Sequence, residues 1–175
     1  MASREELERI RKLNGEERIK EELELLLNNP DSNAVFFVDY WNEDEPKYDH
    51  WKATLLGPTG TVYETGYFNL EIIFPSDYPN QMPTVRFKTK IFHCNVNKDQ
   101  GSICIKILNN WTSTTPRPLM IEVLDNIIFL LVYPNPGSKL NSDFGGKGPD
   151  FENTAREWVK KYANENVFDD MSKQV

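Results

Sequence analysis

The sequence predicts one α+β domain in which helices pack against a four-stranded antiparallel meander. Apolar side chains in residues 16–27 recur at i, i+4, i+7 and i+8, the spacing of one helical stripe, at Ile19, Leu23, Leu26 and Leu27. Four segments rich in β-branched and aromatic residues follow with short connections, which favours consecutive antiparallel strands. They are Val35–Trp41, Tyr48–Leu56, Tyr67–Phe74 and Thr84–Lys88.

Two more helices are expected after the strands. Residues 119–132 are apolar nearly all round, which predicts a central helix buried on most sides and packed on the sheet, and Pro134 ends it. The final helix begins near Pro149 and places its apolar side chains on one face, at Phe151, Ala155, Trp158, Val159 and Tyr162. Lys160 and Lys161 lie near its C-terminus, where cations suit the helix dipole.

The remaining segments are expected to be irregular or peripheral. Residues 74–83 contain three prolines, which forbid a regular helix or a central strand, so we expect an ordered crossing. Three glycines in residues 145–148 disfavour a stable helix and indicate a loop or a shortened element. Residues 3–13 are charged and helix-prone with few apolar side chains, which indicates an exposed extension over residues 1–15. We expect the main domain at 16–166 and a tail at 167–175.

Composition and charge exclude several classes of protein. The 175 residues suffice for one domain, and the net charge of −7 is spread over both ends, which argues against nucleic-acid binding. No apolar run reaches the ~18–20 residues that span a bilayer, and the N-terminus is charged, so we expect no membrane partner and a cytoplasmic or nuclear location. Two cysteines are too few for a disulfide framework and match no zinc spacing, so we expect neither metal nor cofactor.

One stretch carries the chemistry, Lys90 to Trp111. A polar turn, His93-Cys94-Asn95, precedes Gly101-Ser102-Ile103-Cys104 by a few residues. A thiol that follows a glycine and a serine is expected to be partly solvated, and a reactive thiol needs such access. A lone thiol is more often a small buried hydrophobe, and that interpretation is kept for Cys94.

This stretch resembles the active site of the ubiquitin-conjugating enzymes, whose motif is His-Pro-Asn, a short turn, and Gly-x-[Ile/Val]-Cys-[Leu/Ile]. Here Cys94 stands in place of the proline, and the turn between Asn95 and Gly101 is one residue longer. The Pro-rich crossing at 74–83 and the final helix are also similar to the family. The resemblance extends over residues 16–163 in the family's order of elements, and it implies the family's fold.

The resemblance implies roles for five side chains. Cys104 is the thioester carrier, and Asn95 is either the oxyanion stabiliser or the organiser of the active-site loop. Ser138 takes the position that faces the incoming lysine, although an ordinary loop serine is an equal alternative, and Leu140 matches the hydrophobic residue that follows. His93 is expected to be structural, because no neighbouring carboxylate orients it for proton transfer.

The resemblance also implies partners. An activating enzyme, a ligase, a substrate lysine and either ubiquitin or a ubiquitin-like protein are expected, with Arg18 and Lys20 of the first family helix contacting the activating enzyme. A non-catalytic variant that binds ubiquitin or a conjugating partner is the alternative from another class. Such variants characteristically lack the active cysteine, whereas Cys104 is present in its motif.

Overall fold

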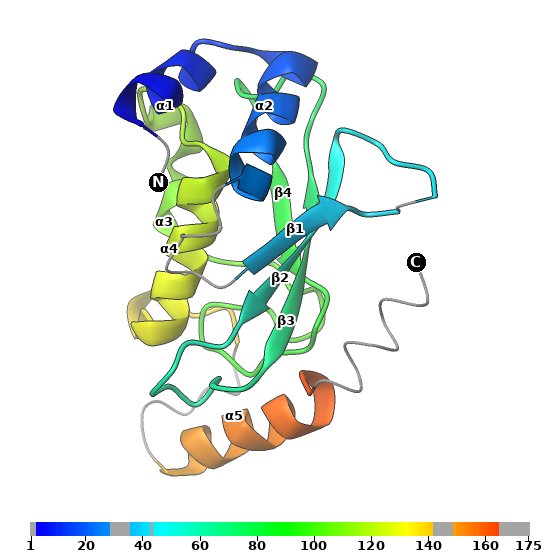
Figure 1. Cartoon of the computed structure of the whole chain (residues 1–175). Coiled ribbons are helices and arrows are strands. Elements are labelled where there is room, and N and C mark those ends of the chain that lie inside the picture. The colour runs from blue at the N-terminus through cyan, green and yellow to red at the C-terminus, as the bar shows by residue number, and fades with distance from the viewer. Residues whose placement is uncertain (1–2, 29–35, 43, 142–148, 165–175) are drawn as a thin grey trace.

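The four predicted strands form one antiparallel sheet in the order β1-β2-β3-β4, which confirms the meander. The computed structural model describes residues 3–28, 36–42, 44–141 and 149–164. The strands are β1 (Phe36–Tyr40), β2 (His50–Leu56), β3 (Tyr67–Ile73) and β4 (Thr84–Phe87) (Figure 1). They are shorter than predicted by one or two residues at some ends. One row of paired residues crosses the whole sheet and is buried, namely Val38, Ala53, Leu70 and Phe87.

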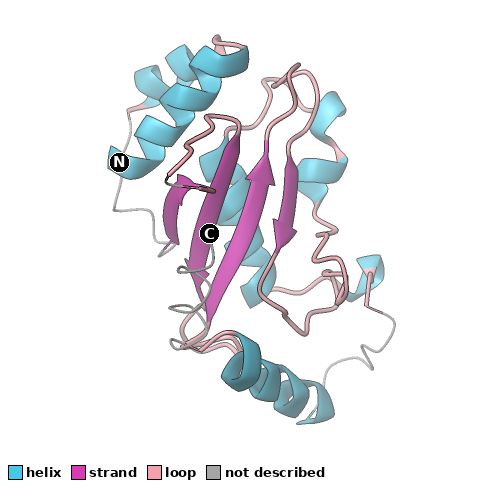
Figure 2. Ribbon diagram, turned by 90° about the vertical axis from the view of Figure 1, so that its right-hand side faces the viewer, coloured by secondary structure: helices cyan, strands magenta, loops and turns pink. Residues whose placement is uncertain are grey.

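Helices lie on one face and at both ends of this sheet (Figure 2). Helix α2 (Gly15–Asn28) contacts β1, and α4 (Met120–Val132) lies behind the strands in the view of Figure 2. Helix α5 (Pro149–Tyr162) runs beneath the lower end of the sheet, as its predicted apolar face requires. A short helix that the sequence pattern did not indicate, α3 (Lys106–Asn109), begins two residues after Cys104. No described helix is long and apolar enough to cross a membrane.

Helix α4 is less enclosed than its composition indicates. Six of its side chains are buried in the core, at Met120, Val123, Leu124, Ile127, Leu130 and Leu131. Phe129, however, is 61% exposed and packs against the equally exposed Tyr133, with the ring centroids 4.7 Å apart and the rings tilted at 42°. The expectation of a helix buried on most sides was therefore wrong, because the sheet covers only one side of α4.

The N-terminal residues are more than an exposed extension. Helix α1 (Arg4–Arg11) begins after Ser3, whose hydroxyl accepts the Glu6 N–H, and it buries Ile10 against Leu25 and Leu119. The Arg11 guanidinium donates to the Glu122 carboxylate at 2.7 Å. These contacts correct the expectation, because one apolar residue per turn is enough to attach a short charged helix to the domain.

The proline-rich segment 74–83 contains neither helix nor strand, as predicted, but it is firmly packed. Tyr78 is buried between the rings of Phe74 and Trp111, and the Trp111 indole N–H donates to the Pro79 carbonyl at 2.8 Å. The crossing is therefore part of the core. The expected loop at 145–148 lies outside the described residues.

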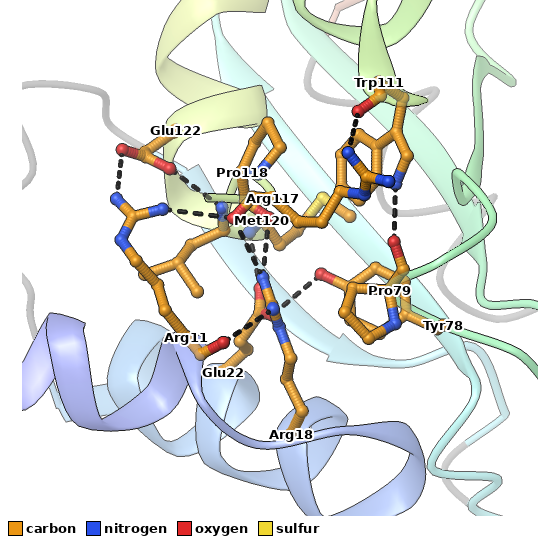
Figure 3. A network of polar contacts seen from close by, with 11 residues as sticks. Arg11, Arg18, Glu22, Tyr78, Pro79, Trp111, Arg117, Pro118, Met120 and Glu122 are labelled. Carbon is orange, nitrogen blue, oxygen red and sulfur yellow. Dashed lines mark hydrogen bonds and ion pairs between the residues drawn. The ribbon is translucent and has the colours of Figure 1, made fainter. Parts of the chain in front are cut away.

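A buried ion pair joins this crossing to α2 and α4 (Figure 3). Arg18 and Glu22 are each 1% exposed, and the Arg18 Nε donates to Glu22 at 2.8 Å. The same carboxylate accepts the Tyr78 hydroxyl at 2.7 Å and the backbone N–H of Met120, at the start of α4. One carboxylate thus fixes three segments that are far apart in the sequence.

The guanidinium of Arg18 donates four hydrogen bonds inside the molecule, the first of them to Glu22. It donates to the backbone carbonyls of Arg117 and Pro118, at 3.2 and 2.8 Å, and to that of Arg11 at 3.4 Å (Figure 3). A side chain buried in this way cannot contact a partner protein. The predicted contact of Arg18 with an activating enzyme is therefore wrong. A basic residue in the sequence did not indicate an exposed cation here, because its counter-ion Glu22 lies one helical turn away and is buried with it.

We predict that Glu22→Gln destabilises the protein by about 3–5 kcal/mol, because it leaves the buried Arg18 cation without a counter-charge. Urea denaturation followed by circular dichroism measures the free energy of unfolding. Glu24→Gln is the matched control, since Glu24 is an exposed residue of the same helix. Equal losses in the two variants would contradict the structural importance of the pair.

Candidate active site

The reactive stretch folds back on itself and brings the polar turn beside Cys104. Val96 and Ile103 form an antiparallel bridge, and the Cys104 N–H donates to the Asn95 carbonyl at 2.8 Å. The longer connection between them is a compact turn, because the Asn97 side-chain oxygen accepts the backbone N–H groups of Asp99 and Gln100, at 3.0 and 2.8 Å. The additional residue therefore leaves Asn95 opposite Cys104.

Gly101 attaches this stretch to the sheet. Its carbonyl accepts the Phe87 N–H at 2.9 Å, and its φ of +70° is one that glycine adopts without strain. A Cβ atom at this position would lie 1.9 Å from the Phe87 carbonyl oxygen. The glycine that precedes the reactive cysteine is thus required by a close approach to β4.

The thiol of Cys104 is half-buried and free, as the sequence predicts for a reactive cysteine. The side-chain amide of Asn109, the last residue of α3, donates to its sulfur at 3.4 Å. The sulfur is thus open to solvent on one side and contacted by an amide on another.

Asn95 is completely buried, and its amide is saturated with hydrogen bonds. The Nδ2 group donates to the carbonyl oxygens of Asn135 and Ser138, at 2.7 and 2.8 Å, and Oδ1 accepts the Asn135 N–H at 2.8 Å. Both amide hydrogens therefore hold the loop that follows α4. Of the two roles that the resemblance implies for Asn95, this geometry supports the organiser of the loop.

His93 makes only structural contacts. Its Nδ1 accepts the Asn95 backbone N–H at 3.0 Å, so its Nε2 carries the proton and donates to the Leu130 carbonyl at 3.1 Å. Burial lowers the pKa of His93 from 6.5 to about 4, since a charged ring would lose its hydration. A neutral imidazole with both nitrogens occupied supports the structural role.

Cys94 lies beneath the site. Its side chain is fully buried, its S–H donates to the Asn95 Oδ1 at 3.1 Å, and burial raises the pKa of its thiol. Its backbone carbonyl accepts the N–H groups of Leu140 and Asn141, at 2.8 and 3.2 Å. These features agree with a small buried side chain whose backbone fixes the neighbouring loop.

The loop after α4 forms the other wall of the site. Residues Pro136–Ser138 make one 3-10 turn, which begins where the Asn135 side chain accepts the Gly137 N–H at 3.1 Å. Ser138 is partly exposed, and its hydroxyl lies 3.4 Å from the Asn135 Nδ2. Leu140 is 40% exposed. The structure thus brings the loop of Ser138 and Leu140 to the polar turn beside Cys104 through backbone bonds that the sequence does not reveal.

Lys20, the second basic residue expected to meet an activating enzyme, is exposed on α2 and pairs with Glu16 one turn away. Its side chain is 56% exposed, so this contact stays a prediction. Among the residues that the structure describes, no group of three or more His, Cys, Asp or Glu side chains could hold a metal ion.

Sequence reasoning missed Asn109 and Asn135. Asn135 could have been found from the resemblance, since it lies between the prolines of the loop that contains Ser138. Asn109 gives no comparable signal, because a single asparagine in a four-residue helix belongs to no pattern.

Comparison with known proteins agrees with this architecture. The family model of the ubiquitin-conjugating enzymes matches residues 18–164. The chain is 35% identical over 151 residues to ubiquitin conjugating enzyme E2 B of Dictyostelium discoideum, covering 83% of this chain and 96% of that protein. It is 44% identical over 119 residues to a protein of Arabidopsis thaliana named probable ubiquitin-conjugating enzyme E2 31, covering 65% of this chain and 75% of that protein.

A solved structure is similar over a comparable length. The E2 domain of a ubiquitin conjugating enzyme from Toxoplasma gondii superposes with a TM-score of 0.73 at 28% identity, covering 85% of this chain and 99% of that chain. Fold, site and relatives define an E2 transferase domain. The chain belongs to the ubiquitin-conjugating enzyme family, whose members act with ubiquitin, an activating enzyme and a ligase.

We predict that His93 makes the stability of the protein depend on pH. Because its pKa is lower in the folded state than the ordinary 6.5, its stabilisation is complete above that pH and is lost as the pH falls toward about 4. The shift corresponds to an expected loss of about 3 kcal/mol in the free energy of unfolding, and urea denaturation across this pH range tests it.

His93→Gln retains one acceptor and one donor but does not titrate, so its stability should fall less over the same pH range. His50→Gln serves as the control, because His50 lies at the surface against Glu71. A wild-type pH profile in His93→Gln would mean that other groups cause the acid sensitivity.

Proposed function

We propose that this enzyme accepts ubiquitin from an activating enzyme as a thioester on Cys104 and passes it to a substrate lysine, usually with a ligase. One observation carries the proposal, namely a solvent-accessible thiol beside a loop that a buried asparagine holds in place. The names of the relatives favour ubiquitin over a ubiquitin-like protein as the modifier.

The reaction consists of two acyl transfers. In charging, the Cys104 thiolate attacks the carbonyl carbon of the activated modifier. The bond between that carbon and the activating enzyme breaks, and its electron pair goes to the activating enzyme. In discharge, a neutral lysine nitrogen attacks the thioester carbon, the new C–N bond forms and the C–S bond breaks. The sulfur leaves as a thiolate, and the proton of the nitrogen passes to solvent.

We assign Asn95 the part of loop organiser and Ser138 the part of a neutral contact for the incoming lysine. Only about one lysine in 10³ is uncharged near neutral pH, given its ordinary pKa of ~10.4, so the site must favour the neutral amine. Leu140, which is partly exposed in the same loop, would desolvate the amine, and the Ser138 hydroxyl would orient it.

Partners are proposed to meet surfaces away from the thiol. Lys20 on α2 is exposed and suits an acidic patch on the activating enzyme. The proline-rich crossing and the loop after Trp111 lie side by side, joined by the indole hydrogen bond to Pro79, and Met82 is 55% exposed there. These two loops are the proposed ligase contact.

We predict that Cys104→Ala abolishes a reducible adduct with ubiquitin in the presence of activating enzyme and ATP, as judged on non-reducing gels. Cys104→Ser should give at best an ester that resists thiol reductant, because an alkoxide is a poorer leaving group than a thiolate. Ubiquitin-like proteins tested in parallel identify the modifier.

Cys94→Ala is the matched control for that experiment and should charge at nearly the wild-type rate, since its thiol is buried. A loss beyond about tenfold, equivalent to ~1.4 kcal/mol in the barrier, would show that Cys94 takes part in the reaction. Charging of Cys104→Ala would refute the assignment of the carrier.

We predict that Asn95→Ala and Ser138→Ala separate the two proposed roles. Asn95→Ala should lower the melting temperature and slow discharge to free lysine by about 10²-fold, because a displaced loop misplaces the acceptor. Ser138→Ala should slow discharge modestly without a change in melting temperature. Single-turnover discharge of the charged enzyme measures both.

The contrary outcomes are distinct. If Asn95→Ala slows discharge without lowering the melting temperature, Asn95 acts as the oxyanion donor. If Ser138→Ala and Ser138→Asp both match wild type at every pH, Ser138 is a plain loop residue.

A further inference from the structure

The side chain of Asn109 donates a hydrogen bond to the sulfur of Cys104. Its Nδ2 lies 3.4 Å from Sγ, a normal distance for a bond to sulfur. Helix α3 fixes the position of Asn109, since the Asn109 backbone N–H donates to the Ile105 carbonyl at 3.0 Å. The amide therefore reaches the reacting atom from a helix that starts only two residues after it.

The amide that the family resemblance places at this site is otherwise engaged. Both hydrogens of the Asn95 amide are bound to loop carbonyls, at 2.7 and 2.8 Å, and its side chain is inaccessible. An amide with no hydrogen left to donate cannot stabilise new charge without breaking a bond that holds the loop. The side-chain donor that the structure places at the reacting sulfur is Asn109 and not Asn95.

We propose that Asn109 is a catalytic residue of this enzyme, which stabilises the Cys104 sulfur as a leaving group. The inference rests on the proposed thioester on Cys104. When the lysine nitrogen has bonded to the carbonyl carbon, the C–S bond breaks and its electron pair goes to Sγ, while the proton of the nitrogen passes to solvent. The amide N–H of Asn109 then donates to a sulfur that carries a full negative charge.

The strength of this bond changes along the reaction. Neutral sulfur is a weak acceptor, whereas hydrogen bonds to ionised acceptors are about twice as strong as neutral ones. The contact consequently stabilises the departing thiolate more than the thioester, and only such a difference accelerates the chemical step. The same donor lies at the sulfur when the Cys104 thiolate attacks during charging.

The experiment compares variants that keep or remove the donor at position 109. Single-turnover discharge of the ubiquitin-charged enzyme to free lysine should be about 3- to 10-fold slower in Asn109→Leu, since the bond is solvent-exposed and weaker than a buried one. Asn109→Asp, which has the same shape but places a negative charge beside the sulfur, should be slower still, and added salt should reduce its deficit. Asn109→Lys, which restores a donor, should approach or exceed the wild-type rate.

Asn110→Leu is the matched control, because Asn110 is an exposed neighbour of the same residue type at the end of α3. It should discharge at the wild-type rate. Equal rates in all four variants would overturn the proposal. Equal slowing in the three Asn109 variants with lowered melting temperatures would do so as well, by assigning Asn109 a purely structural part.

A second measurement separates this inference from the proposed function. Alkylation of Cys104 by iodoacetamide, in a Cys94→Ala background, needs no modifier protein and reports the thiolate directly. Its pH profile should move to higher pH in Asn109→Asp and stay in place in Asn110→Leu, even if no modifier charges the enzyme. An unmoved profile in Asn109→Asp would refute the role of Asn109, whereas absent charging with a moved profile would refute only the thioester function.

Discussion

The buried pair of Arg18 and Glu22 is the constraint on which the rest of the domain depends. Two charges removed from water are tolerated only when other groups satisfy their remaining hydrogen-bonding atoms. Here those groups are the Tyr78 hydroxyl, the Met120 N–H at the start of α4, and backbone carbonyls near Pro118. These bonds therefore fix α2, the proline-rich crossing and α4 relative to one another. The loop of the active site follows α4 directly.

In the candidate active site, the groups that hold the loops in place are different from the group proposed to react. Backbone bonds to the Cys94 carbonyl and the buried Asn95 amide hold its walls, while Cys104 stays accessible at the surface. In the proposed reaction, charge changes only at the accessible side. The groups that hold the loop are neutral, since His93 has a pKa of about 4, so chemistry at the sulfur does not require them to change protonation.

Periodicity and turn chemistry predicted the fold, because a local pattern of apolar residues indicates each strand and helix. Ala53 and Leu70, which pair on the buried face of the sheet, belong to two such patterns. Local patterns did not predict the burial of a side chain where contacts with distant segments determine it. Nothing near Arg18 in the sequence shows that carbonyls a hundred residues away accept its hydrogens, and nothing near Phe129 shows which side of α4 the sheet covers. The prediction that Cys104 is the reactive cysteine came from resemblance to a family motif, whereas its neighbour Asn109 lies outside that motif.

The unequal accessibility of the two cysteines has a practical consequence. In the folded protein only Cys104 meets solvent, and Cys94 is sealed beneath the polar turn. The native protein thus behaves toward a bulky thiol reagent as a single-cysteine protein, and one probe can be attached at the proposed thioester position without engineering. Cys94 takes up a second equivalent of label only when the domain unfolds, so the number of labels per molecule measures the unfolded fraction.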